Sequence, residues 1–138
     1  MAELESYIVL AGRVLYSMIF VVSGIWHFQN SGSLAAFAQA RGVPLPHAAV
    51  MGSGLLILAG GLSVLFGFRA RLGSALLLLF LVPVTLVMHR PLSDPLQATQ
   101  ALKNLALMGG ALMILVHGSG PLSLDRLKRR DPATAALP

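Results

Sequence analysis

The sequence predicts an all-α membrane protein: a bundle of four transmembrane helices with a short interfacial helix between the first two spans. Of its 138 residues, 56% are hydrophobic and only 11% are charged, whereas soluble domains carry about 25% charged residues. The apolar residues gather into long stretches that suit a hydrocarbon core of about 30 Å. A chain this short and this apolar cannot bury its hydrophobic surface in one soluble core, so we expect it in the membrane.

The first apolar stretch covers residues 8–28 and is interrupted only by Arg13. A cleaved signal peptide would begin with a basic segment and carry a shorter apolar region. This chain instead begins with Glu3 and Glu5 and has no early lysine or arginine. We therefore expect the first stretch to be retained as a membrane span.

The second apolar stretch, residues 48–68, is rich in small side chains. Ser53, Gly60 and Gly67 recur every seven residues within it. Small residues let helix backbones approach closely inside a membrane. We interpret this face of the second span as a packing surface.

The third and fourth spans are predicted at residues 72–89 and 98–117. Residues 68–71 leave room only for a tight antiparallel hairpin before the third span. Pro83 lies inside that span and predicts a bend, because proline removes a backbone donor. Two prolines in residues 89–100 discourage a continuous helix between the last two spans.

The link between the first two spans predicts a short helix at residues 31–42. Ser31 or Ser33 can cap its start and Gly42 can end it. The apolar residues of this segment share one helical face. We expect the helix to lie along the membrane surface.

The domain organisation follows from these spans: residues 1–125 form one transmembrane bundle, and residues 126–138 form a basic tail. An even number of spans places both termini on one side, together with Arg69, Arg71, Arg126, Lys128, Arg129 and Arg130. The opposite side holds Arg41, Arg90 and Lys103. The positive-inside rule therefore predicts cytoplasmic N- and C-termini.

Two global properties restrict the chemistry. The net charge of +5 is explained by positive-inside topology, and no phosphate loop or basic-aromatic platform points to nucleic acid. Cysteine is absent, which excludes disulfides and thiolate sites in this chain. Any redox reaction must then use a bound cofactor or a partner subunit.

Polar residues of the first span follow a helical spacing. Arg13, Ser17, Phe20, Gly24 and His27 recur at intervals of four, three, four and three residues, which places them on one face. Polar groups inside a span usually face the bundle. Two interpretations of the arginine stay open: it extends to the headgroups of the inner leaflet, or it is a buried cation with an anionic or carbonyl partner.

Three histidines share one predicted membrane level. The topology places His27, His47 and His89 near the outer surface and His117 near the inner one. Interfacial histidines often bind only water and headgroups. A metal site would need more carboxylates than Asp94 alone provides, and a bis-histidine haem would need two of the histidines to face each other across the bundle.

A fourth alternative is that the residues at this membrane level bind a lipid-soluble ligand. The polar head of a quinone or a similar lipid-soluble molecule needs only a few hydrogen-bonding groups at interface depth. His27, His89 and Arg90 can supply them, with Trp26 and Phe28 as apolar walls.

Four segments of the sequence carry a family resemblance. The first span is AGRVLYSMIFVVSGIWHF, with a Gly-Arg near its start and a Ser-Gly pair near its end. RGVPLP forms the turn into span two, and GFRARLGSALLLLFLVPVTLVMHRP contains a basic hairpin and a third span ending in histidine. LKNLALMGGALMI lies in the fourth span. Together these segments resemble the DoxX family of bacterial inner-membrane proteins over about residues 10–125.

The resemblance implies a four-helix inner-membrane protein in bacteria. Members called DoxD form the membrane subunit of a thiosulfate:quinone oxidoreductase, and others are linked to oxidative-stress redox assemblies. Carried over by position, the family's recurrent polar points fall on Arg13, Gly24, His89, Lys103 and Asn104.

These observations lead to a functional hypothesis. We expect a membrane subunit that anchors and supports a quinone-linked oxidoreductase, with membrane lipids and other redox subunits as partners. The cofactor-binding candidates are Arg13, His27, His89, Arg90 and Lys103. The hypothesis predicts a cavity between spans one, three and four. The alternative is a non-catalytic accessory subunit; a transporter is disfavoured because no inverted repeat or broken helix pair is evident.

Overall fold

The computed structural model describes residues 1–89 and 95–130 and is all-helical over them, with no strand in those two segments. The helices are α1 (Ala2–Gln29), α2 (Ser31–Ala40), α3 (Pro46–Phe66), α4 (Ala70–Met88), α5 (Pro95–His117) and α6 (Leu124–Arg130). The predicted fold class is confirmed. Each predicted span lies within two or three residues of a helix, except that α1 begins six residues before residue 8.

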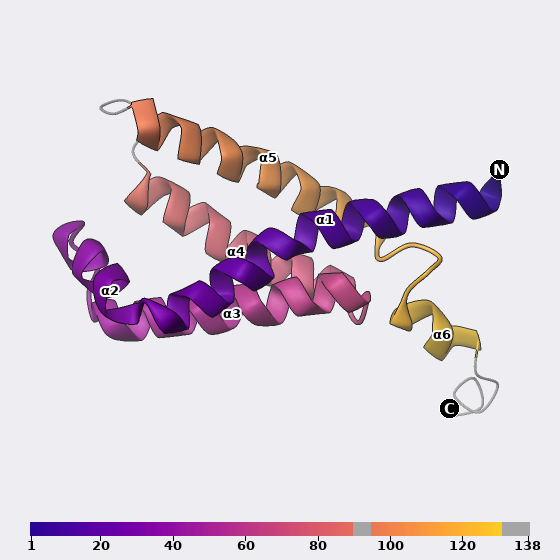
Figure 1. The fold of residues 1–138 in the computed structure, drawn as a ribbon, viewed down its shortest axis with the longest axis horizontal. Helices are drawn as coiled ribbons and strands as arrows, with labels where there is room; N and C mark the ends of the chain where they lie inside the picture. Colours follow the sequence, from indigo (N-terminus) through magenta and orange to yellow (C-terminus); the bar gives the residue numbers. More distant parts are fainter. Residues whose placement is uncertain (90–94, 131–138) are drawn as a thin grey trace.

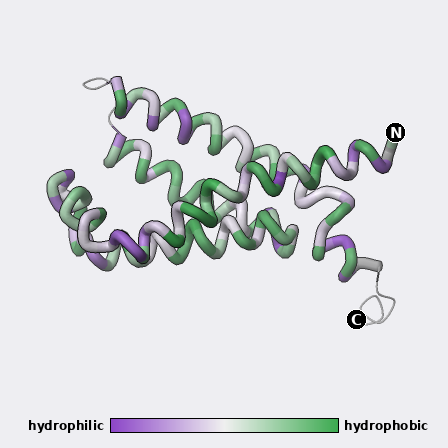
Figure 2. The backbone as a smooth tube through the Cα atoms, viewed as in Figure 1, coloured by the Kyte–Doolittle hydropathy of each residue, from purple (hydrophilic) through white to green (hydrophobic). Residues whose placement is uncertain are grey.

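Four of the helices are long and apolar enough to cross a membrane. They cover Glu3–Gln29, Pro46–Phe66, Ala70–Met88 and Pro95–His117. Figure 2 shows hydrophobic residues along their middle turns and hydrophilic residues gathered towards the ends of the bundle. This pattern suits a lipid-facing exterior, since a helix satisfies its own backbone hydrogen bonds.

The four long helices pack side by side in the order in which they follow one another in the chain. Helix α1 packs along α3, α3 along α4, and α4 along α5. The start of α1 and helix α6 lie at one end of the bundle, which we call the termini end; α2 and the start of α5 lie at the other, which we call the far end (Figure 1). Helices α1 and α5 diverge towards the far end.

Close helix packing depends on glycine, as the small-residue pattern predicts. A Cβ atom on Gly24 would lie 2.8 Å from Leu58 Cβ, between α1 and α3. A Cβ atom on Gly60 would lie 2.9 Å from the Gly73 carbonyl oxygen, between α3 and α4. Real Cβ atoms do not approach so closely, so these backbones meet because the side chains are missing. The apolar core beside them consists of Phe20, Ile57, Val64, Leu77 and Leu81.

The termini end is closed by the segment that enters α6. Asp125 accepts hydrogen bonds from the backbone N–H groups of Arg69 at 2.7 Å and Ala70 at 3.2 Å. Its own N–H donates to the Gly67 carbonyl at 2.9 Å. Arg69 has a φ of 49° and no side-chain capping bond of its own. The first turn of α4 is therefore capped by a carboxylate from the other end of the chain.

One local expectation, the capping residue of α2, needed correction. Neither Ser31 nor Ser33 caps α2: the N-cap is Asn30, which makes no side-chain capping bond. The reason is that α1 ends at Gln29 and only one residue separates the two helices, so Ser31 already belongs to α2. The predicted boundary after residue 125 falls inside α6.

Candidate far-end cavity

A cavity of about 480 Å³ lies at the far end between α1, α4 and α5, with α2 and α3 completing its walls. The predicted cavity between spans one, three and four is therefore present, and His27, His89 and Lys103 all line it. Most of its lining is apolar. The cavity lies at the end of the bundle where α1 and α5 diverge (Figure 1).

His27 enters the cavity from α1. Its Nδ1 lies 2.7 Å from the Ser23 carbonyl oxygen, one turn earlier. A carbonyl oxygen only accepts, so Nδ1 carries the proton, and in the neutral ring Nε2 is then an acceptor. The ring meets Phe80 edge-on at 6.1 Å between centroids. On its other side His27 Cβ lies close to Gly54 of α3, where no side chain intervenes. The ring is thus held by both α1 and α3.

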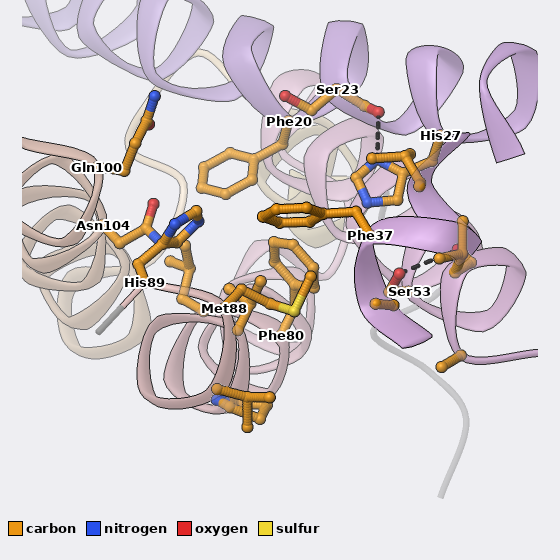
Figure 3. A pocket seen from close by; sticks show the side chains of 18 of the residues that line it. Phe20, Ser23, His27, Phe37, Ser53, Phe80, Met88, His89, Gln100 and Asn104 are labelled. Atoms are coloured by element: carbon orange, nitrogen blue, oxygen red, sulfur yellow. Dashed lines mark hydrogen bonds between the residues drawn. The ribbon is translucent and has the colours of Figure 1, made fainter. Parts of the chain in front are cut away.

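His89 enters from the opposite side, immediately after α4. Its Nδ1 lies 2.8 Å from Gln97 Oε1 on α5, so this ring too is oriented through Nδ1. Figure 3 shows His27 and His89 on either side of the cavity, with Phe37 and Phe80 between them. Neither Nε2 atom has a hydrogen-bond partner within residues 1–89 and 95–130. Two oriented imidazoles with unpaired Nε2 atoms thus flank an aromatic cavity.

Helix α5 adds an amide and an ammonium group. Asn104 is buried and donates through Nδ2 to Thr85 Oγ1 at 3.0 Å. The Thr85 hydroxyl in turn donates to the Leu81 carbonyl at 2.6 Å, which leaves Asn104 Oδ1 as an acceptor at the cavity wall (Figure 3). Lys103 is exposed, and its Nζ lies 2.5 Å from Gln100 Oε1. Asn104 therefore lies with His89 on one side of a mostly apolar chamber, opposite His27 (Figure 3).

Helix α2 forms the outer wall of this chamber. Phe37 projects from it into the cavity (Figure 3). Arg41 lies with its guanidinium carbon 4.9 Å from the Phe37 ring centroid and donates through Nη1 to the Met88 carbonyl at the end of α4. Ala35 and Ala38 of α2 pack against Val50 of α3. Arg41 therefore ties the end of α2 to the end of α4.

The structure does not bring every predicted residue here. Arg90 lies outside the described residues. His47, expected at the level of His27 and His89, is exposed on α3 and is not part of the lining. His117 lies at the termini end, with Nδ1 3.0 Å from the Met113 carbonyl.

Arg13 does not join the cavity either. It lies towards the termini end and is only 6% exposed. Its Nη1 donates to the Ser119 carbonyl, and its Nη2 donates to the Leu122 carbonyl at 2.8 Å. Of the two interpretations left open, the buried cation with carbonyl partners is the one found. Arg13 is not part of the cavity lining: its Nη1 and Nη2 hold the C-terminal segment, and its Nε has no partner among the described residues.

Sequence reasoning did not assign Phe37 and Phe80 to the lining or Gln97 to the orientation of His89. An aromatic residue or an amide on a helix is common and does not by itself indicate a site. The position of Phe37 could have been inferred, because it belongs to the apolar face of the predicted short helix. Such a face packs against other apolar residues. The position of Gln97 could not, because its pairing with His89 depends on the path of the chain between them.

The fold and cavity can now be set beside known proteins. A family model described as DoxX matches residues 8–90, more than half of the chain. The inner membrane protein YqjF of Escherichia coli (strain K12) is 30% identical over 130 residues, which cover 92% of this chain and 96% of that protein. No solved structure matches. With its four membrane-spanning helices, the chain therefore belongs to the DoxX family of integral membrane proteins.

Proposed function

We propose that this protein is a bacterial inner-membrane subunit that binds the head of a quinone, or a similar lipid-soluble ring, for a redox partner. The observation that carries the proposal is the far-end cavity, where His27 and His89 flank an aromatic chamber of about 480 Å³. Ligand sites of this kind are mostly apolar, with a few polar groups that fix orientation. The location follows the curated relative, which is named as an inner membrane protein.

The hydrogen-bonding capacity of the cavity suits both redox forms of such a ligand. Reduction of a quinone to a quinol takes up two electrons and two protons. With Nδ1 protonated, a neutral His27 or His89 accepts from a quinol hydroxyl through Nε2, and an imidazolium donates to a quinone carbonyl. Lys103 adds a further donor at the edge. The two imidazoles can therefore exchange protons with the ligand head.

The electrons must come from elsewhere. The chain has no cysteine, and within the described residues no group of three potential metal ligands comes together. A partner subunit would carry the electron-transfer chemistry, while this chain supplies the membrane site. We further propose that both termini are cytoplasmic, which places the cavity near the outer leaflet.

The accessory-subunit alternative keeps one specific observation in its favour. Gly52 on α3 and Gly109 on α5 are exposed, and nothing lies within 4 Å of a Cβ built on either. Such open small-residue positions can receive another helix. A stable complex from mild detergent extraction in which a partner covers these faces, together with no quinone binding, would favour this alternative.

Trp26 gives the proposal a direct test. It is the only tryptophan in the chain and lines the cavity, so a quinone bound there should quench its fluorescence. We expect saturable quenching when a short-chain ubiquinone is titrated into the purified protein in detergent. A decyl alcohol of similar hydrophobicity should produce none.

The variants distinguish binding of the quinone in the cavity from its partitioning into the detergent micelle. His27→Ala and His89→Ala should each weaken the apparent affinity roughly tenfold, since a hydrogen bond involving a charged group is worth about 1.5–3 kcal/mol. His47→Ala is the matched control, because His47 is exposed outside the lining and should bind like the wild type. Linear quenching that is identical in all four proteins would overturn the proposal.

A further inference from the structure

A second hollow lies at the termini end, far from the cavity described above. Its volume is about 490 Å³, and the turn before α4, the end of α5 and the segment leading into α6 line it. The charged residues of its lining are Arg69, Arg71, Asp125 and Arg126. Nothing in the quinone proposal uses this hollow.

The positive charge of the hollow is not balanced within the described residues. Asp125 is the only carboxylate in the lining. Its Oδ1 accepts from the Arg69 backbone N–H, and its Oδ2 accepts from the Ala70 N–H and, at 3.3 Å, from the Ser119 hydroxyl. Because these donors are all neutral, the carboxylate forms no ion pair there, and three guanidinium groups remain for one external anion.

Backbone groups reinforce this preference. The Ser119 carbonyl accepts from buried Arg13 and is therefore already paired. The N–H groups of Ser119 and Gly120 donate to no acceptor in the part of the chain that the structure describes. Arg71 donates through Nη2 to the Val116 carbonyl at 3.1 Å, which covers an exposed acceptor at the end of α5. The hollow therefore offers donors and few acceptors, as an anion requires.

The residues around the hollow indicate which kind of molecule the anion belongs to. Leu72 lines the hollow at the first turn of α4 and is exposed, and Val116 is exposed at the last turn of α5. Both turns belong to helices able to cross a membrane, so the hollow lies at the level where a span meets headgroups. A basic pocket between the ends of spans is suited to a lipid phosphate.

We propose that this hollow binds the headgroup phosphate of an anionic phospholipid. Arg69, Arg71 and Arg126 contact the phosphate, and the acyl chains run along Leu72 and Val116. The site is independent of the quinone proposal and of which leaflet the termini end faces. It also supplies a reason for the basic residues here beyond topology, because they converge on one hollow.

The test uses the full-length protein, purified, stripped of lipid and examined by native mass spectrometry. Dioleoyl-phosphatidylglycerol and dioleoyl-phosphatidylethanolamine are added separately at equal mole fraction. We expect the anionic lipid to bind as one retained molecule and the zwitterionic lipid to bind more weakly. Arg126→Gln should weaken phosphatidylglycerol binding about fivefold, and the double variant Arg71→Gln/Arg126→Gln about twenty-five-fold.

Control variants make the outcome decisive. Arg126 is exposed, so its single variant should fold even if the double variant does not. Lys103→Gln removes the same charge at the far end and should leave lipid binding unchanged. Equal retention of both lipids, or an equal effect of Lys103→Gln and Arg126→Gln, would overturn the site. Displacement of phosphatidylglycerol by millimolar inorganic phosphate would assign the hollow to free phosphate and overturn the lipid assignment.

Discussion

The guanidinium of Arg13 donates a hydrogen bond to the carbonyl of Ser119, a residue 106 positions later in the chain. A second bond from the same side chain reaches the Leu122 carbonyl. These contacts join the first span to the segment between the last span and α6. An arginine inside a membrane span is costly unless it is paired or faces the protein interior, and here backbone carbonyls supply the partners.

Arg13→Gln should release the C-terminal segment. Because hydrogen bonds to charged groups contribute about 1.5–3 kcal/mol each, we expect the free energy of unfolding in micelles to fall by roughly 2–4 kcal/mol. Trypsin should also cleave faster after Arg126 in the native protein. Arg126→Lys keeps the charge and the cleavage site and should behave as the wild type; an equally fast cleavage in both variants would contradict the role of Arg13.

Asp125→Ala should destabilise the first turn of α4, because it removes the acceptor for the Arg69 and Ala70 N–H groups. Loss of a capping side chain costs about 0.5–2 kcal/mol. Unfolding followed by circular dichroism measures the change. Asp125→Asn keeps one acceptor oxygen and should recover part of the loss, whereas Glu5→Ala, on the exposed first turn of α1, should have little effect.

Gly54→Ala should disturb the cavity from the side of α3. Its new Cβ would lie 2.9 Å from His27 Cβ, so α1 and the His27 ring must shift. We expect weaker quinone quenching of Trp26 together with lower stability. Gly52→Ala is the control on the same helix, because nothing lies within 4 Å of its Cβ position. If both alanines had the same effect, the close approach of α1 and α3 at His27 would not matter for binding.

Gly110→Ala and Gly109→Ala form a second matched pair. A Cβ on Gly110 would lie 2.6 Å from the Tyr16 ring, while the position on Gly109 is open. Gly110→Ala should therefore lower the thermal midpoint, and Gly109→Ala should raise it slightly through better helix propensity.

Tyr16→Phe removes the 2.7 Å hydrogen bond to the Leu107 carbonyl. It should lower the free energy of unfolding by about 1 kcal/mol.

Local periodicity predicted the buried face of the first span correctly. Arg13, Ser17, Phe20 and Gly24 are all buried, and His27 is partly buried. Helical geometry fixes such a face from neighbouring residues alone. The same reasoning placed His27, His89 and Lys103 at one end, because alternating spans determine the end to which each residue belongs.

The remaining features depend on contacts that no local pattern encodes. The capping of α4 by Asp125 joins residues 55 and 56 positions apart. The acceptors of Arg13 lie on a segment whose path is set by tertiary packing, so sequence alone left its interpretation open. His47 shares the histidine level but lies on the exposed face of α3, which small-residue spacing could not reveal.

The far-end cavity is lined by helices able to cross a membrane, and this position has a consequence for how it fills. A lipid-soluble ligand that enters from between these helices arrives by diffusion within the bilayer, so occupancy follows its mole fraction in lipid rather than its concentration in water. Adding empty vesicles at constant total ligand would then empty the site by dilution. A strongly partitioning molecule would occupy it even where the intrinsic contacts are weak, whereas a hydrophilic analogue with the same ring would seldom reach it.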